Sequence, residues 1–147
     1  MKNTLIVLTA AALFAALPAS AKDVAPDQVP QAARTFVESR YADARGLDWD
    51  WDADDSRWEA EFATPAGDVE VQFDAEGRFV RSKEDVARDA MPAAILNAVE
   101  ARHPHARVLG ANKLTTPEGV FWDVGLRRPN GGYRNILVDD QGRIVRE

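Results

Sequence analysis

An aspartate-rich segment holds the residues whose types and spacing could bind a metal ion. Calcium loops place oxygen ligands at positions 1, 3, 5, 9 and 12. In segment 48–59 these positions are occupied by Asp48, Asp50, Asp52, Ser56 and Glu59. Position 6, where such a loop needs glycine, is Ala53. A β-strand with Trp49 and Trp51 toward the core and the aspartates toward solvent fits the alternation better, so calcium binding is the second hypothesis.

The sequence carries no recognisable catalytic motif. It has no cysteine, Gly-x-Ser-x-Gly, phosphate-binding loop or His-Glu-x-x-His. His103 and His105 flank a proline with no third ligand suggested, so we expect surface histidines. Glu59 and Glu61 alternate with apolar residues, which is typical of the solvent side of a strand. We therefore expect a protein that is not an enzyme and holds no cofactor.

The N-terminus is typical of an export signal. Lys2 precedes an apolar run over residues 5–17 and a small-residue cleavage site ending at Ala21. We expect residues 1–21 to be a signal peptide, with no membrane span after cleavage, because no later stretch is apolar enough to cross a bilayer. The predicted localisation is periplasmic or secreted.

The two halves of the mature chain differ in charge. Residues 22–89 contain 9 basic and 18 acidic residues, net −9, whereas residues 90–147 contain 8 basic and 6 acidic residues, net +2. Neither half carries a basic stripe, so nucleic-acid binding is disfavoured. The acidic half favours a protein partner with a basic surface.

One short helix is expected in each half. The first begins near Pro30, with apolar residues at helical spacing, and the second begins at Met91-Pro92 and ends at His103-Pro104. Alternation of period two predicts strands over 47–52, 57–62, 68–73, 78–81, 107–114, 120–127, 133–138 and 143–146. We expect 78–81 to be a short edge strand and 22–28 to be a flexible lead-in.

The halves can be aligned at an offset of 62 to 65 residues. Val29-Pro30 matches Met91-Pro92, Trp58 matches Trp122, and Phe73-Asp74 matches Val138-Asp139. The predicted fold class is α+β: tandem repeats, over 29–86 and 87–147, form one antiparallel sheet with two helices packed on one face. Sharing a sheet protects edges that two small units would otherwise expose.

These patterns resemble the PepSY-like family, which is grouped with the β-lactamase-inhibitor-like proteins. The resemblance is carried by the proline-initiated helices, by segments 50–62 and 69–77, and by the Phe-Asp-x-x-Gly and Val-Asp-x-x-Gly turns. It covers nearly the whole mature chain, although Ala42 replaces an expected proline. The resemblance implies an exported, non-enzymatic module that binds or inhibits other proteins.

The sheet face away from the helices is the predicted binding surface. The alternation places Glu59, Glu61, Glu70 and Gln72 on it in the first half, and Phe121 and Tyr133 in the second. The predicted contact residues are Glu59, Glu61, Phe121 and Tyr133. Aromatic side chains beside charges are typical of protein-binding patches. The alternative is that Phe121 or Tyr133 belongs to the core, because both sides of 133–138 are apolar. We expect a protein partner, which could be an envelope hydrolase; the alternative function is an envelope ligand or calcium sensor using segment 48–59.

Overall fold

The computed structural model describes residues 24–147, so the predicted signal peptide lies outside the described residues. Two helices and eight strands follow one another in the order helix, four strands, helix, four strands, with two short 3-10 helices. Their bounds are η1 Pro26–Gln28, α1 Gln31–Arg40, β1 Arg45–Asp52, β2 Arg57–Thr64, β3 Gly67–Phe73, β4 Phe79–Ala87, η2 Arg88–Ala90, α2 Ala93–Arg102, β5 Arg107–Thr116, β6 Gly119–Arg127, β7 Tyr133–Asp139 and β8 Ile144–Arg146.

Both helices begin directly after a proline. Pro30 and Pro92 are the N-cap residues of α1 and α2, where a missing N–H breaks no helical hydrogen bond. The predicted helix starts are confirmed to within one residue. Each helix buries an i, i+4 pair on the sheet, one pair being Val37 with Ala33 and the other Val99 with Ile95.

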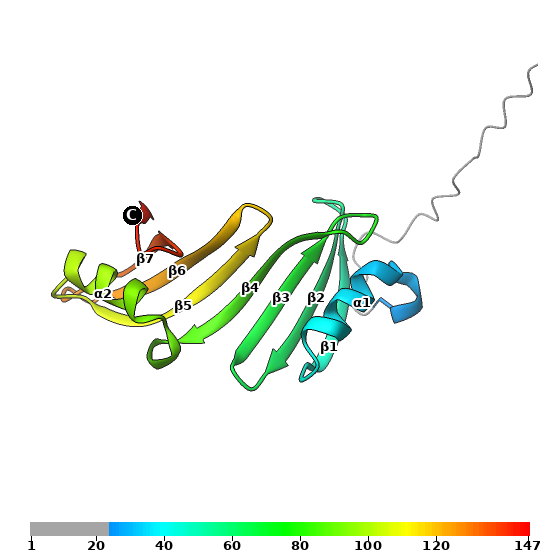
Figure 1. The fold of residues 1–147 in the computed structure, drawn as a ribbon, viewed down its shortest axis with the longest axis horizontal. Coiled ribbons are helices and arrows are strands. Elements are labelled where there is room, and N and C mark those ends of the chain that lie inside the picture. The colour runs from blue at the N-terminus through cyan, green and yellow to red at the C-terminus, as the bar shows by residue number, and fades with distance from the viewer. Residues whose placement is uncertain (1–23) are drawn as a thin grey trace, which may run out of the picture.

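The eight strands form one antiparallel sheet in the order of the sequence, which confirms the predicted α+β class. α1 lies near the β1 end of the sheet and α2 near the other end (Figure 1). Paired residues share a face, and one row of partners runs Phe62, Val69, Glu84, Lys113, Trp122, Val138. Since the row begins under α1 and ends under α2, both helices cover the same face. We call this the helix face and the opposite one the outer face.

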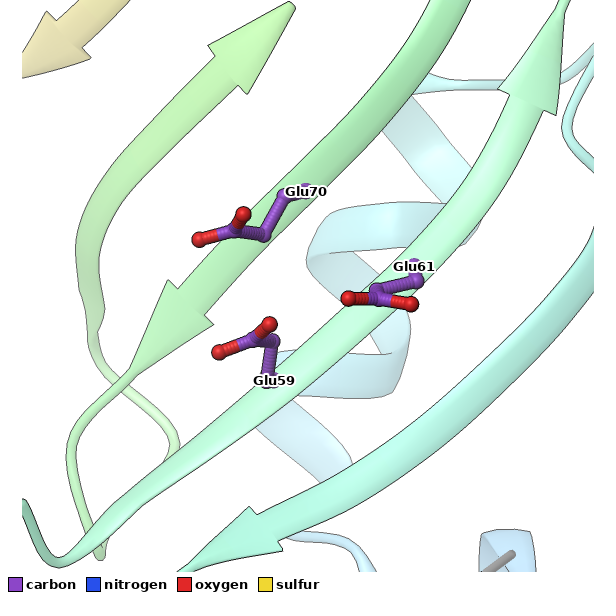
Figure 2. Close-up of side chains that lie close together, drawn as sticks. All are labelled: Glu59, Glu61 and Glu70. Carbon is purple, nitrogen blue, oxygen red and sulfur yellow. The ribbon is translucent and has the colours of Figure 1, made fainter. Parts of the chain in front are cut away.

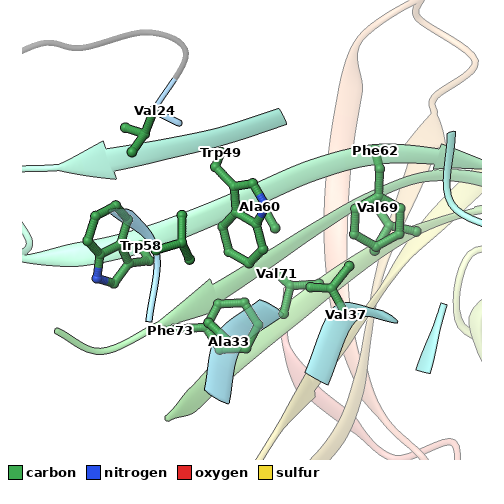
Figure 3. Packing of buried hydrophobic residues seen from close by; sticks show 11 residues of the cluster. Val24, Ala33, Val37, Trp49, Trp58, Ala60, Phe62, Val69, Val71 and Phe73 are labelled. Carbon is green, nitrogen blue, oxygen red and sulfur yellow. The ribbon is translucent and has the colours of Figure 1, made fainter. Parts of the chain in front are cut away.

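The helix face carries two hydrophobic cores. In the first, α1 packs Val37 against Phe73 and Val71, each at most 1% exposed, with Trp49 and Trp58 beside them (Figure 3). The second core lies under α2. It consists of Met91, Ile95, Val99, Val108, Ala111, Trp122, Val124, Leu126, Ile136 and Val138. Trp49 is in the core and Asp50 is exposed, so the strand interpretation of the aspartate-rich segment is confirmed.

The prediction of a short edge strand over 78–81 is wrong. The strand is β4, which runs to Ala87 and pairs with both β3 and β5 at the centre of the sheet. The helix-face positions of β4 include Ser82 and Glu84, which lie between the two cores rather than under a helix. Because Ser82 and Glu84 are polar, this part of the sequence lacks the regular apolar residues by which a central strand is recognised.

Part of the expected flexible lead-in is packed against the sheet. Val24 is 6% exposed, belongs to the first core, and donates its backbone N–H to the carbonyl of Trp49 at 3.0 Å. Residues Pro26–Gln28 form a 3-10 turn. Val24 is therefore held against the sheet by burial and by one backbone hydrogen bond, whereas residues 25–28 are exposed and residues 22 and 23 of the expected lead-in lie outside the described residues.

Candidate functional site

All four predicted binding residues lie on the outer face. Glu59 and Glu61 belong to β2, Phe121 to β6 and Tyr133 to β7. Each lies at a position that alternates with the buried residues of its strand, so its side chain is on the opposite face of the sheet. Tyr133 is 71% exposed, whereas Ile136, three residues further along the same strand, is fully buried. The structure therefore places Phe121 and Tyr133 outside the core. Their role in binding stays a prediction.

The four residues do not form one patch. Cross-strand pairing aligns Glu61, Glu70, Lys83, Leu114 and Phe121 in a single row across the outer face. Tyr133 lies at the other end of β6, opposite Arg127, whose guanidinium carbon is 5.9 Å from the centre of the tyrosine ring. The structure therefore places Phe121 in the same row as Glu61 and Glu70, with β4 and β5 between them, and leaves Tyr133 outside this row.

Three carboxylates converge where β2 and β3 pair. One oxygen from each of Glu59, Glu61 and Glu70 lies within 4.8 Å of the others. Figure 2 shows the three side chains together on the side of the sheet away from the helix. Glu61 and Glu70 are direct cross-strand partners, and Glu59 is two residues before Glu61 on the same face. We call this group the glutamate triad.

Gln72 organises the glutamate triad. Its side chain is 7% exposed and donates hydrogen bonds from Nε2 to Glu59 at 3.0 Å and to Glu70 at 3.2 Å. Its carbonyl oxygen accepts from Arg81 at 2.9 Å and from Arg57 at 3.2 Å. A buried amide with both ends hydrogen-bonded fixes the carboxylates on either side of it.

The negative charge of the triad is only partly neutralised. Burial raises the pKa of Glu59, the hydrogen bond from Gln72 opposes this effect, and the charges of Glu70 and Glu61 add to it. Arg81 and Lys83 on β4 approach Glu70 at 3.4 and 3.5 Å. Among the ion pairs of residues 24–147, none includes Glu59 or Glu61. The triad therefore offers acceptor oxygens to an additional cation.

The outer face has two hollows, one on each side of β4. The first, of about 580 Å³, is lined by residues of β1 to β4, including Asp48, Glu61, Asp68, Glu70 and Lys83. The second, of about 400 Å³, is lined by residues of β4 to β7, including Gly110, Asn112, Asp123, Gly125 and Asn135. The first hollow is acidic, and the second has a floor of small side chains.

The calcium candidates lie along a hairpin rather than around a loop. Asp48, Asp50 and Asp52 lie on β1, Ser56 is in the turn, and Glu59 is on β2. Asp52 accepts the backbone N–H groups of Asp54 at 2.9 Å and Asp55 at 3.2 Å, so its carboxylate stabilises the turn. Of the five candidates, only Glu59 belongs to the carboxylate cluster found among the described residues.

Sequence reasoning placed Glu70 and Gln72 on the outer face without choosing them as contact residues, and it missed Lys83. The alternation of 68–73 predicts that Glu70 and Gln72 lie on the same face as Glu59, and the strand pairing confirms this position. Lys83 was missed because the strand containing it was predicted to end at residue 81. Recognising β4 as a full-length central strand would have placed Lys83 beside Glu70.

The fold is shared with solved structures. A BLIP-like protein from Bacteroides fragilis NCTC 9343 is 18% identical, with a TM-score of 0.68 over 81% of this chain and 84% of that chain. A DUF2874 family protein from Bacteroides uniformis ATCC 8492 is 24% identical, with a TM-score of 0.67 over 80% and 87%. A protein from Bacteroides eggerthii DSM 20697, provisionally assigned to the periplasm, is 24% identical, with a TM-score of 0.66 over 80% and 86%.

These likenesses show a common fold. No family model and no curated protein matches the sequence. The assignment of the two halves as PepSY-like repeats stays a prediction. Among the described residues, no helix is long and apolar enough to cross a membrane.

Proposed function

We propose that this protein is an exported, non-enzymatic module that binds another protein through the outer face of its sheet and acts by occlusion. The observation that carries the proposal is the outer face itself. Both helices pack on the other side of the sheet, and in the described part of the chain no element covers the outer face. The uncovered sheet and its two hollows form a large surface of defined shape, to which a partner protein can be complementary.

The chemistry of this face supports protein binding. Phe121 and Leu114 are cross-strand partners that present half-buried apolar side chains beside the charged row of Glu61, Glu70 and Lys83. Tyr133 adds an exposed aromatic ring at the far end of β6. Apolar and aromatic anchors surrounded by polar groups are the usual composition of binding hot spots.

The structural neighbours support an extracytoplasmic role. One is BLIP-like and another is provisionally assigned to the periplasm, in agreement with the predicted signal peptide. We propose that the mature chain, residues 22–147, functions in the periplasm or after secretion. Its target is a protein of the same compartment, for which an envelope hydrolase is the first candidate.

Affinity capture from an envelope extract tests this function. The mature chain serves as bait beside three variants: Phe121→Ala and Tyr133→Ala on the outer face, and Leu96→Ala on α2 as a control on the helix side. Truncating a central aromatic contact costs about 1 to 4 kcal/mol of binding. We therefore expect Phe121→Ala to lose the partner while Leu96→Ala retains it. Equal capture by all baits would contradict binding through this face.

A further inference from the structure

The outer face has a gradient of charge from one edge to the other. Paired positions on β1 to β4 carry eight carboxylates and four cationic groups, a difference of four negative charges. The carboxylates are Asp48, Asp50, Asp52, Glu59, Glu61, Asp68, Glu70 and Asp85, and the cations are Arg45, Arg57, Arg81 and Lys83. On β5 and β6 the outer positions are mostly uncharged, with Asn112, Leu114 and Phe121 among them.

The cationic groups of β1 to β4 leave most of these carboxylates without an ion pair. Among the described residues, Glu70 is the single outer-face carboxylate on these four strands with a cationic group within 4.0 Å. Arg57 and Arg81 both direct a donor to the carbonyl oxygen of Gln72. The face therefore holds a concentrated negative charge in a defined arrangement.

This charge surrounds a hollow rather than a flat surface. The hollow of about 580 Å³ is lined by carboxylates from three strands, including Asp48, Glu61 and Glu70, and by Asp85 of β4. Carboxylates on the walls of a concavity concentrate the electric field and favour a cationic occupant. Burial is the main cause that raises the pKa of Glu59, the hydrogen bond from Gln72 opposes it, and the charges of Glu70 and Glu61 raise the pKa further, so a cation placed beside these carboxylates is favoured.

We propose that the partner protein presents an extended segment rich in arginine or lysine, which lies across β1 to β4 with its cationic side chains over the glutamate triad. This inference rests on the proposed function and specifies the partner's chemistry. A guanidinium group fits between carboxylates that already lie within 4.8 Å of one another. The segment's apolar flank then meets Leu114 and Phe121, which continue the same row.

A fluorescein-labelled peptide of alternating arginine and serine is the test probe. An extended chain places every second side chain on one side, at a spacing of roughly 6.5 Å, so all the arginines of this peptide face the same way. Fluorescence anisotropy measures its binding to the mature chain, and a peptide with glutamate in place of arginine is the control. We expect binding of the arginine peptide, weakened as salt rises from about 50 to 300 mM, and none of the glutamate peptide.

Two triple variants separate this site from net charge. The first, Glu59→Gln with Glu61→Gln and Glu70→Gln, removes three charges from the triad. The second, Asp27→Asn with Glu38→Gln and Glu118→Gln, removes three charges from exposed residues outside the four acidic strands. We expect the first to weaken peptide binding at least about tenfold and the second less than about threefold. Thermal melts check that both variants fold.

The outcomes distinguish this inference from the proposed function. Equal weakening by the two triple variants, or no binding of the arginine peptide by the wild type, would overturn the basic-segment proposal. Suppose that a partner captured from the extract is lost with Phe121→Ala but retained by the triad variant. Binding through the outer face would then stand, and the basic segment would be rejected.

Discussion

The hydroxyl of Tyr41 donates a hydrogen bond to Oε1 of Glu84, with 2.9 Å between the two oxygens. Tyr41 directly follows α1, and Glu84 lies on the helix face of the central strand β4. This contact ties the first helix to the strand that joins the two halves of the sheet. Burial, followed by the negative charge of Glu84, raises the pKa of Tyr41.

We predict that Tyr41→Phe lowers the free energy of unfolding by about 1 kcal/mol, because Glu84 loses a hydrogen-bond donor. The raised pKa means that the folded protein holds the phenolic proton more tightly than the unfolded chain does. Stability therefore falls as the pH rises above about 10, the ordinary pKa of tyrosine. Urea unfolding at pH 7 and 10.5 measures both effects.

The matched control is Tyr133→Phe, because Tyr133 is the other tyrosine and is 71% exposed. It should leave the free energy of unfolding within about 0.5 kcal/mol of the wild type. Identical alkaline destabilisation of the wild type and Tyr41→Phe would show that the Tyr41–Glu84 contact does not contribute to it.

Gly77 lies where the turn between β3 and β4 meets the start of α1. Its φ is 84°, and a Cβ there would lie 2.6 Å from Cβ of Pro30. Gly131 has the same φ of 84°, with no atom within 4 Å of a Cβ. Alanine at either position costs about 1 to 2 kcal/mol for the left-handed backbone, and at Gly77 the helix start must also move. We expect Gly77→Ala to destabilise more than Gly131→Ala by about 1 kcal/mol or more. Equal losses in urea unfolding would contradict the close packing of this turn on α1.

Asp139 stabilises the turn between β7 and β8. Its Oδ1 accepts hydrogen bonds from the backbone N–H groups of Arg143 at 2.9 Å and Gln141 at 3.0 Å. Its Oδ2 accepts a hydrogen bond from Nε of Arg143 at 2.6 Å. Asp74 makes the corresponding contacts with Glu76 and Arg78 between β3 and β4. The backbone hydrogen bond from Arg143 is the main cause that lowers the pKa of Asp139; partial desolvation opposes it, and the Arg143 side chain lowers the pKa further.

A lowered pKa means that this carboxylate stabilises the fold at neutral pH. We predict that the stabilisation is lost as the pH falls from about 4, the ordinary pKa of aspartate, through the lower value in the folded state. Asp139→Asn should be less stable than the wild type at pH 7, and the two should converge in acid. Thermal melts from pH 2.5 to 7 measure this, with Asp43→Asn as an exposed control. If the difference in Tm between the wild type and Asp139→Asn stayed constant over the whole pH range, it would contradict the conclusion that the ionised carboxylate of Asp139 stabilises the fold.

The glutamate triad should destabilise the free protein. Because the pKa of Glu59 is raised in the folded state, stability is greater when Glu59 is protonated and falls as the pH rises through about 4 to the raised value. We expect Glu59→Gln to raise Tm at pH 7 by roughly 1 to 3 °C and to have less effect at pH 3.5. Glu118→Gln, on an exposed turn, serves as the control. A fall in Tm for Glu59→Gln at pH 7 would contradict the conclusion that the Glu59 charge destabilises the fold through its burial and its acidic neighbours.

Local patterns were sufficient to predict both helices and the faces of most strands. The prolines before α1 and α2 marked their first turns, and the alternation around Trp58, Val71 and Trp122 separated core from solvent positions. These features depend on residues near one another in the chain, so they can be read without knowing which strands pair. The outer-face positions of Glu59, Glu61 and Phe121 followed from the same alternation.

The tertiary structure decided what the sequence left open. Pairing of β4 with both β3 and β5 made it central, although Ser82 and Glu84 gave it the sequence of an edge strand. The register between β2 and β3 brought Glu70 beside Glu61, and the neighbouring strands aligned Phe121 with them. Single-strand alternation fixes the face of each side chain, whereas its neighbours across the sheet depend on register, which is set by contacts between segments far apart in the chain.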